Sequence, residues 1–156
     1  MLRLSIFIIS VLLFVGFCPA EKSITITKEV ADYSVIDSVL IGDLLSIYAQ
    51  KPKDLIYIKS EAGKHQSLAK AIYEVEGIEA GKRVEEFLIR HYKMGRLKFY
   101  CCGWESGGQL GQYTSKQLKA IDPYCSLIIT MHSDEILDRD RNKVKKLYVV
   151  VEVVVV

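Results

Sequence analysis

Apolar residues recur at helical spacing through the first half of the chain. Residues 32–51 place apolar side chains three and four positions apart, as an amphipathic helix does. The same spacing predicts helices over residues 60–75 and 82–93, and Gly95 is the expected C-cap of the second. Residues 54–59 fit either a strand or the start of a helix. The first half therefore reads as mainly helical.

The second half changes to the alternating and β-branched patterns of strands. Residues 97–104 alternate as one strand, and residues 124–132 and 147–156 predict two more. A glycine-containing loop and a short helical turn, capped by Thr114 or Ser115, separate the first strand from the second. A short strand is also expected over residues 23–27. The chain is thus expected to end in a sheet.

This order of elements predicts an α+β fold, with N-terminal helices packed on a C-terminal antiparallel sheet. In the simplest topology the last three strands form a meander, and helices cover one face of it. A curved sheet with helices in its concavity would be cystatin-like or nuclear-transport-factor-like. Residues 21–156 are long enough for a single domain with one core.

Residues 1–20 have the pattern of a secretory signal peptide. Arg3 precedes an apolar run that is too short to span a bilayer, and Ala20 stands before the polar Glu21. We therefore expect a periplasmic or secreted protein whose mature chain has no membrane span. A lipoprotein anchored through Cys18 and an uncleaved membrane anchor are the alternatives.

Three cysteines remain once the signal is removed. Cys101, Cys102 and Cys125 are an odd number, so one disulfide and one free thiol is the simplest expectation in an exported protein. Adjacent cysteines form a strained bond, which favours pairing of Cys125 with Cys102 or with Cys101.

The overall charge argues against partners that recognise basic proteins. The net charge is +2, and removal of Arg3 with the signal leaves +1. Such a balance provides no basic excess for nucleic acid or for an anionic membrane. Another protein is the expected partner, and the oligomeric state is left open.

The motifs that resemble catalytic or metal sites are incomplete. Residues 138–142 alternate acidic side chains as a calcium loop does, but the glycine and the final acid of that loop are missing, so a solvated charged turn is preferred. Ser106 lies in a glycine-rich loop without the strand-turn-helix pattern of a nucleophile. The paired carboxylates Glu85-Glu86 are expected to face solvent. No catalytic residue, metal ligand or cofactor is predicted, and no metal-ligand spacing relates His65, His91 and His132.

Aromatic residues gather around the cysteines. Tyr100, Trp104, Tyr113 and Tyr124, together with Glu105, are candidate partner-binding residues, because binding surfaces use rigid aromatic anchors. The alternative is equally ordinary, since tyrosine also favours half-buried strand positions.

Short features spread over residues 41–123 point towards one family: Gly42-Asp43-Leu44-Leu45, Gly77 and Gly81, the cysteines at 101–102, Gln109 and Pro123. Together they resemble the periplasmic immunity proteins of type VI secretion amidase effectors. The resemblance implies a small exported protein that blocks the active site of a toxin by binding to it.

Three hypotheses about function follow. The first is a non-enzymatic exported binding protein, such as an inhibitor or immunity protein. The second is a small exported enzyme or ligand carrier, with His91, Tyr100 or Glu105 lining a pocket between helices and sheet. The third is a structural subunit that pairs through residues 147–156, which are apolar on both faces.

Overall fold

The structure is a computed structural model that describes residues 41–64 and 66–156. The predicted signal peptide with Cys18, the strand over 23–27, the first part of the helix over 32–51 and His65 lie outside these residues. The described helices are α2 (Leu44–Tyr48), α3 (Ile78–Tyr92), α4 (Lys116–Ile121) and the 3-10 helix η1 (Arg141–Lys143). The strands are β1 (Ile56–Ala62), β2 (Ser67–Glu76), β3 (Leu97–Tyr100), β4 (Gly103–Ser106), β5 (Gly111–Tyr113), β6 (Cys125–Ser133) and β7 (Lys146–Val155).

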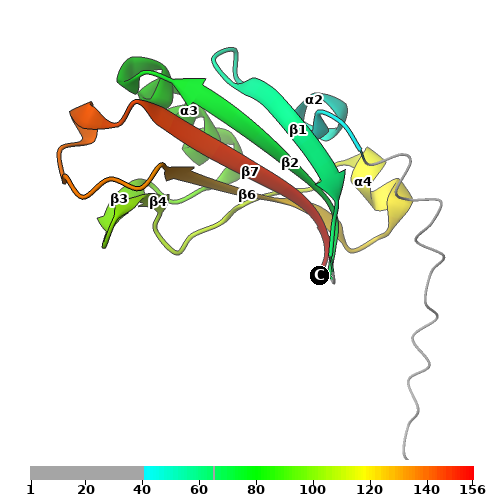
Figure 1. The fold of residues 1–156 in the computed structure, drawn as a ribbon. Helices are drawn as coiled ribbons and strands as arrows, with labels where there is room; N and C mark the ends of the chain where they lie inside the picture. The colour runs from blue at the N-terminus through cyan, green and yellow to red at the C-terminus, as the bar shows by residue number, and fades with distance from the viewer. Residues whose placement is uncertain (1–40, 65) are drawn as a thin grey trace, which may run out of the picture.

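All seven strands belong to one antiparallel sheet, so the predicted α+β class with an antiparallel sheet is confirmed. The order across the sheet is β1-β2-β7-β6-β4-β3, and β5 pairs with β6 beside β4 (Figure 1). The C-terminal strand β7 lies between β2 and β6 and pairs with both along its length. Its two apolar faces are explained by this central position, which removes the motive for the structural-subunit hypothesis.

The helix predicted over residues 60–75 is wrong, because these residues form the hairpin of β1 and β2. Ala69, Ala71, Tyr73 and Val75 alternate into the core and are fully buried. Their apolar neighbours Leu68 and Ile72 create an additional helical spacing in the sequence. Pairing with β7 on the other side of β2 selects the strand. Helices and strands were expected to be segregated along the chain, but β1 and β2 precede α3.

The single strand predicted over residues 97–104 is also wrong, because the chain reverses at Cys101-Cys102 and forms the β3–β4 hairpin. Gly95 is not the C-cap of α3. The left-handed residue at that position is Lys93, with φ 62°, while the Gly95 N–H donates to the Gln109 carbonyl at 2.7 Å.

Other local predictions are confirmed. Helix α3 covers the predicted helix at 82–93 and buries Val84, Leu88 and Tyr92 against the sheet. Helix α4 begins at the predicted cap, where the Ser115 hydroxyl accepts a hydrogen bond from the Leu118 N–H at 3.2 Å. Strands β6 and β7 match the two predicted C-terminal strands.

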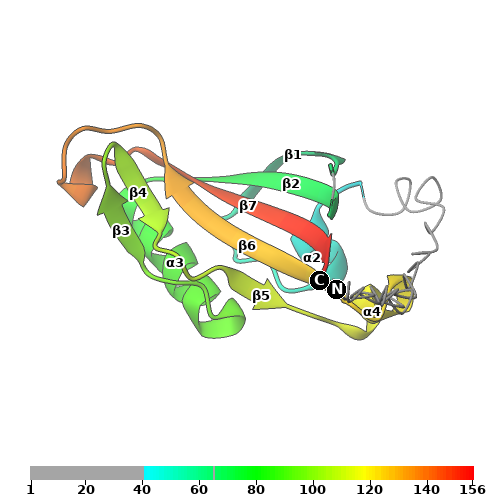
Figure 2. The same cartoon turned by 90° about the horizontal axis from the view of Figure 1, so that it is seen from below.

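The three α-helices lie on one side of the bent sheet (Figures 1 and 2). On that side the core is apolar and filled by fully buried side chains from the central strands and α3. Helix α3 packs closely on the sheet at Gly81, where an added Cβ would meet the Leu147 Cδ1 at 2.5 Å. In the described part of the chain, no helix is both long enough and apolar enough to cross a membrane.

Candidate partner-binding surface

The structure divides the five predicted partner-binding residues between different places. Tyr100, Trp104 and Glu105 share the β3–β4 hairpin, and Tyr100 is 45% exposed. Tyr113 lies on β5 with its ring centroid 5.4 Å from that of Tyr92. Tyr124, at 69% exposed, precedes β6 next to α4, at the opposite end of the molecule (Figures 1 and 2). We call the end formed by the β3–β4 hairpin and residues 130–135 the hairpin end.

The hairpin is braced by aromatic and cationic side chains. Phe99 and Trp104 are cross-strand partners, and their ring centroids are 5.9 Å apart in an edge-to-face arrangement. The Arg139 guanidinium lies over Phe99 at 5.7 Å, and that of Arg141 lies over Trp104 at 5.6 Å. These cation–π contacts attach the connection between β6 and β7 to the hairpin.

A buried carboxylate supports the same region. Glu85 on α3 is 1% exposed, so the prediction that both members of the Glu85-Glu86 pair face solvent is wrong for Glu85. Its Oε1 accepts from the Leu97 N–H at 2.7 Å, and its Oε2 accepts from Arg141. Glu85 thereby joins α3, the first residue of β3 and η1. The charge tolerates burial because it is both paired and hydrogen-bonded.

The turn of the hairpin has only two residues. Tyr100 pairs with Gly103, which leaves Cys101 and Cys102 as the loop. Cys101 has φ 44°, in the left-handed region that favours glycine. The Cys102 carbonyl accepts from the Ile136 N–H at 2.7 Å, so the turn is anchored to the segment that follows β6.

A hollow of about 620 Å³ opens where β4 separates from β6. Direct pairing of these strands is confined to Glu105 and His132. Serine hydroxyls bridge the strands elsewhere: that of Ser133 accepts from the Trp104 N–H at 2.9 Å, and that of Ser106 accepts from the Met131 N–H at 3.2 Å. Because side chains replace ladder bonds, the two strands are held apart and the hollow is built into the fold.

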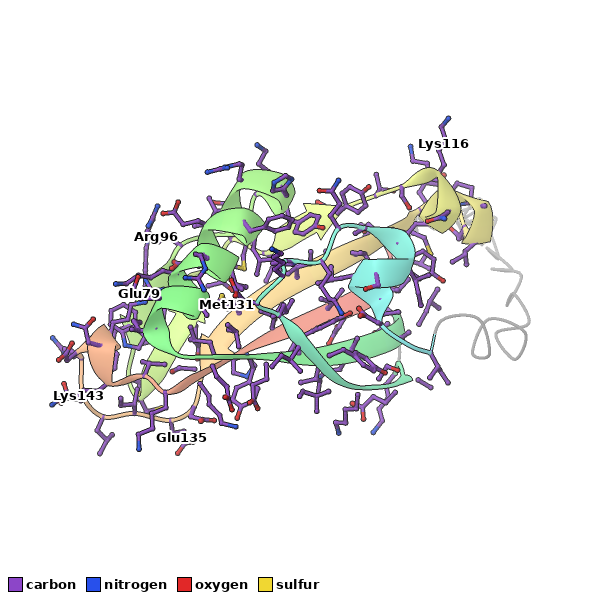
Figure 3. All side chains as sticks on the ribbon, turned by 90° about the horizontal axis from the view of Figure 1, so that it is seen from above. Glu79, Arg96, Lys116, Met131, Glu135 and Lys143 are labelled. Atoms are coloured by element: carbon purple, nitrogen blue, oxygen red, sulfur yellow. The ribbon has the colours of Figure 1, made fainter. Side chains whose placement is uncertain are left out.

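The hollow has an acidic lining. Glu105 and Glu135 line it, and none of its described lining residues is lysine or arginine. The apolar Leu110, which is 51% exposed, also lines it. Glu135 lies at the far end of the molecule from Lys116 on α4 (Figure 3). Such a surface is suited to a cationic group that has an apolar stem.

His132 also lines the hollow, where it is the cross-strand partner of Glu105. Burial lowers the pKa of His132, and the carboxylates of Glu105 and Asp134 oppose that shift without reversing it. The ring lies 5.7 Å from that of Tyr148 on the neighbouring strand. A neutral imidazole at neutral pH follows from this environment.

The predicted disulfides of Cys125 are incompatible with the fold. Cys125 begins β6, whereas Cys101 and Cys102 lie beyond its other end, next to Ile136. A nine-residue strand spans roughly 25 Å, while a disulfide requires Cα atoms within about 7 Å. Cys125 is instead a buried thiol. Its pKa is raised mainly by burial and, to a smaller extent, by the negative charge of Asp122.

The other two thiols are adjacent in the hairpin turn, and that of Cys102 is not activated. Hydrogen bonding with Cys101 and the charge of Cys101 raise the pKa of Cys102, and Glu135 and Glu105 add to the shift. Cys101 is exposed and Cys102 is partly exposed. A raised pKa does not favour a catalytic thiolate at Cys102.

The remaining candidates for chemistry lie apart from one another. The Ser106 hydroxyl accepts a backbone hydrogen bond and is mostly buried. His91 is exposed and stacks on Phe87, with centroids 4.2 Å apart, so it does not line an interior pocket with Tyr100 or Glu105. Among the described residues, no group of three or more histidine, cysteine or acidic side chains is placed to hold a metal ion. Asp140 caps η1 through the Asn142 N–H, as expected for a charged turn.

Three residues of this region were not predicted from the sequence to belong to it: Glu85, His132 and Arg141. Glu85 and Arg141 are separated by 56 positions, so no local pattern relates them. The alternation of β6 does place His132 on the face opposite to the buried Met131, and this was the available signal.

Comparison with known protein families gives one match. The chain is similar over residues 29–104 to a domain of unknown function, DUF4952. The matched segment ends at Trp104 on β4 and so covers the elements from α2 to most of the hairpin, but neither β6 nor β7. No curated protein and no solved structure matches the chain.

Proposed function

We propose that this protein is a small exported, non-enzymatic binding protein, such as an inhibitor or a toxin-immunity protein, and that the hairpin end contacts its protein partner. In this proposal the bent sheet, with α3 in its concavity, is a cystatin-like or nuclear-transport-factor-like scaffold. The scaffold carries the hairpin as a rigid projection.

The observation that carries the proposal is an exposed tyrosine on a braced hairpin beside a hollow. Tyr100 presents a large amphipathic ring from a strand whose backbone is held by the Phe99–Trp104 pair. Little side-chain entropy is lost when such a ring is buried, because tyrosine has only two rotatable side-chain bonds. The adjacent hollow offers a place for one side chain of the partner.

The lining of the hollow defines the chemistry of the partner. Glu105 and Glu135 supply negative charge, and Leu110 supplies apolar contact. We therefore expect the partner to insert a lysine or arginine, whose stem lies along Leu110 while its charged group meets a carboxylate.

Export is part of the proposal and has its own test. If residues 1–20 are a cleaved signal, the protein recovered from the periplasm or medium begins at Glu21 by intact mass. Retention of residues 1–20 would contradict cleavage. A lipid on Cys18 would replace simple secretion with the lipoprotein alternative.

Binding is tested with matched tyrosine variants. We expect Tyr100→Ala to reduce recovery of a macromolecular partner from a periplasmic or secreted extract, because it removes the exposed anchor. Tyr124→Ala is the control, since it removes an even more exposed tyrosine at the opposite end. Equal recovery by both variants would remove the hairpin end from the proposal, and recovery of no partner by the unchanged protein would count against binding altogether.

The immunity hypothesis has a more specific test. If the resemblance to amidase immunity proteins reflects function, this protein should protect cells when it is expressed together with an amidase effector directed to the periplasm. Protection should fail for Glu105→Lys, which reverses a charge in the hollow. Absence of protection by the unchanged protein would leave a different partner class for the hairpin end.

A second candidate function is a small exported ligand carrier or enzyme, favoured by the facing positions of His132 and Glu105 in the hollow. In that case small cationic compounds such as benzamidine or agmatine would shift the NMR resonances of His132. If the protein is instead the proposed protein-binding module, these small compounds alone should cause weak shifts of His132 or none.

A further inference from the structure

The turn at Cys101-Cys102 uses residues that its backbone does not favour. Of the described non-glycine residues, only Lys93 and Cys101 have positive φ. A two-residue hairpin loop with positive φ at its first residue ordinarily places glycine there. A cysteine in this conformation is strained, so the choice of Cys101 is not explained by turn formation.

The position of the pair is equally unusual for free thiols. Cys101 is exposed, Cys102 is partly exposed, and the two side chains interact with each other at the tip of the hairpin. Buried cysteine behaves as a small apolar residue, as Cys125 does here. Packing therefore accounts for Cys125 but not for the two thiols of the turn.

We propose that Cys101 and Cys102 form a reversible thiol–disulfide pair, in which the turn closes into a vicinal disulfide on contact with a low-molecular-weight disulfide. The fold removes Cys125 as an alternative partner by placing it at the far end of β6. The inference goes beyond the proposed binding function and holds whether or not the hairpin end has a protein partner.

The exchange is balanced in two steps. The Cys101 thiolate attacks one sulfur of a disulfide RSSR, forming a mixed disulfide and releasing RS⁻, which takes up the proton that Cys101 lost. The Cys102 thiol then loses its proton and attacks the Cys101 sulfur, and a second RSH leaves. Overall the two protein thiols are oxidised to one disulfide, and RSSR is reduced to two RSH.

Geometry makes this bond labile rather than permanent. Consecutive Cα atoms are separated by about 3.8 Å, whereas disulfides prefer about 4.4–6.8 Å. The strain raises the tendency of the bond to be reduced, which is the property of regulatory disulfides. The strained backbone at Cys101 and the anchor from the Ile136 N–H to the Cys102 carbonyl hold the two residues in one turn during exchange.

The test uses the purified protein and a glutathione buffer. Reduced protein is incubated with glutathione disulfide, acid-quenched, alkylated with N-ethylmaleimide and digested with trypsin. Cleavage after Lys98 and Lys116 isolates both cysteines of the turn from Cys125. We expect this peptide to be two hydrogens lighter and unalkylated. Added reduced glutathione should restore two alkylated cysteines.

Two variants make the outcome specific. Cys102→Ser should accumulate glutathione on Cys101, because the resolving thiol is gone, and Cys125→Ser should behave like the unchanged protein. A lasting glutathione adduct on the unchanged turn, a covalent dimer through Cys101, or two thiols that stay alkylatable throughout would each overturn the proposal. None of these results depends on partner binding, so the proposed function is tested separately.

Discussion

Glu85 on α3 accepts a hydrogen bond from the backbone N–H of Leu97, the first residue of β3, at 2.7 Å. The same carboxylate pairs with Arg141, whose guanidinium lies over Trp104 of the hairpin. One buried acid therefore determines where the hairpin leaves the core.

Replacement of Glu85 should be costly because it leaves the Arg141 charge and the Leu97 N–H without their acceptor. We expect Glu85→Ala to lower the free energy of unfolding in urea by about 3 kcal/mol. Glu86→Ala is the matched control on the same helix. It removes an exposed carboxylate 3.8 Å from Arg96 and should cost within about 0.5 kcal/mol. Similar costs for both variants would contradict the role given to Glu85.

The hydroxyl of Tyr73 connects the sheet to α2. It donates to Asp43 Oδ1 at 2.9 Å and accepts from the Leu45 N–H at 2.9 Å. Tyr73→Phe should leave that buried N–H unpaired and cost about 2 kcal/mol of unfolding free energy. Faster amide exchange at Leu45 should accompany the loss. Tyr57→Phe, which removes a part-buried bond to Ser60, should cost less, and the reverse order would be inconsistent with this structure.

Gly81 tests whether helix propensity or packing dominates on α3. At an exposed helix position, alanine in place of glycine would raise the free energy of unfolding by about 1 kcal/mol. Here its Cβ would meet the buried Leu147 Cδ1, and overpacking costs about 1–3 kcal/mol. We expect a net loss of about 1 kcal/mol, and partial recovery when Leu147→Val is added. Stabilisation by Gly81→Ala alone would mean that Leu147 moves aside freely.

The pH dependence of stability should reveal His132. Burial holds its pKa in the folded protein below the ordinary 6.5. As the pH falls through about 6.5, the unfolded chain therefore takes up the proton first, and the folded state loses stability relative to it. Above that pH both states are neutral and the contribution vanishes.

When the melting temperature is plotted against pH, the curve of the unchanged protein should therefore be steeper than that of His132→Gln. Between neutral pH and pH 5, the unchanged protein should lose more stability than the variant. Parallel curves would show that His132 titrates in the folded protein as it does in the unfolded chain.

The sequence predicts those elements whose signals are local. Helix α3 has a continuous amphipathic face, and Ser115 supplies the cap of α4. The hairpin of β1 and β2 was not predictable in this way. Its apolar residues fit both the helical and the strand period, and pairing with β7 decides between them. That pairing joins residues far apart in the chain: Glu74 and Lys146, which contact each other, are 72 positions apart.

The candidate site divides along the same line. Tyr100, Trp104 and Glu105 share the β3–β4 hairpin because they are neighbours in one short segment. Tyr113 and Tyr124 were not, since the chain passes from β5 through α4 to the opposite end of β6. The buried Glu85–Arg141 pair and the serine bridges around the hollow arise from tertiary contacts that no spacing rule indicates.

Site-specific photo-crosslinking tests the central claim most directly. A benzoylphenylalanine placed at Tyr100 should crosslink to one discrete protein in the exported fraction, and the same probe at Tyr124 should not. Excess unlabelled protein should compete the adduct away, whereas excess Glu105→Lys protein should compete poorly. Capture from Tyr124 but not from Tyr100 would contradict the account, because the binding surface would then lie at the α4 end.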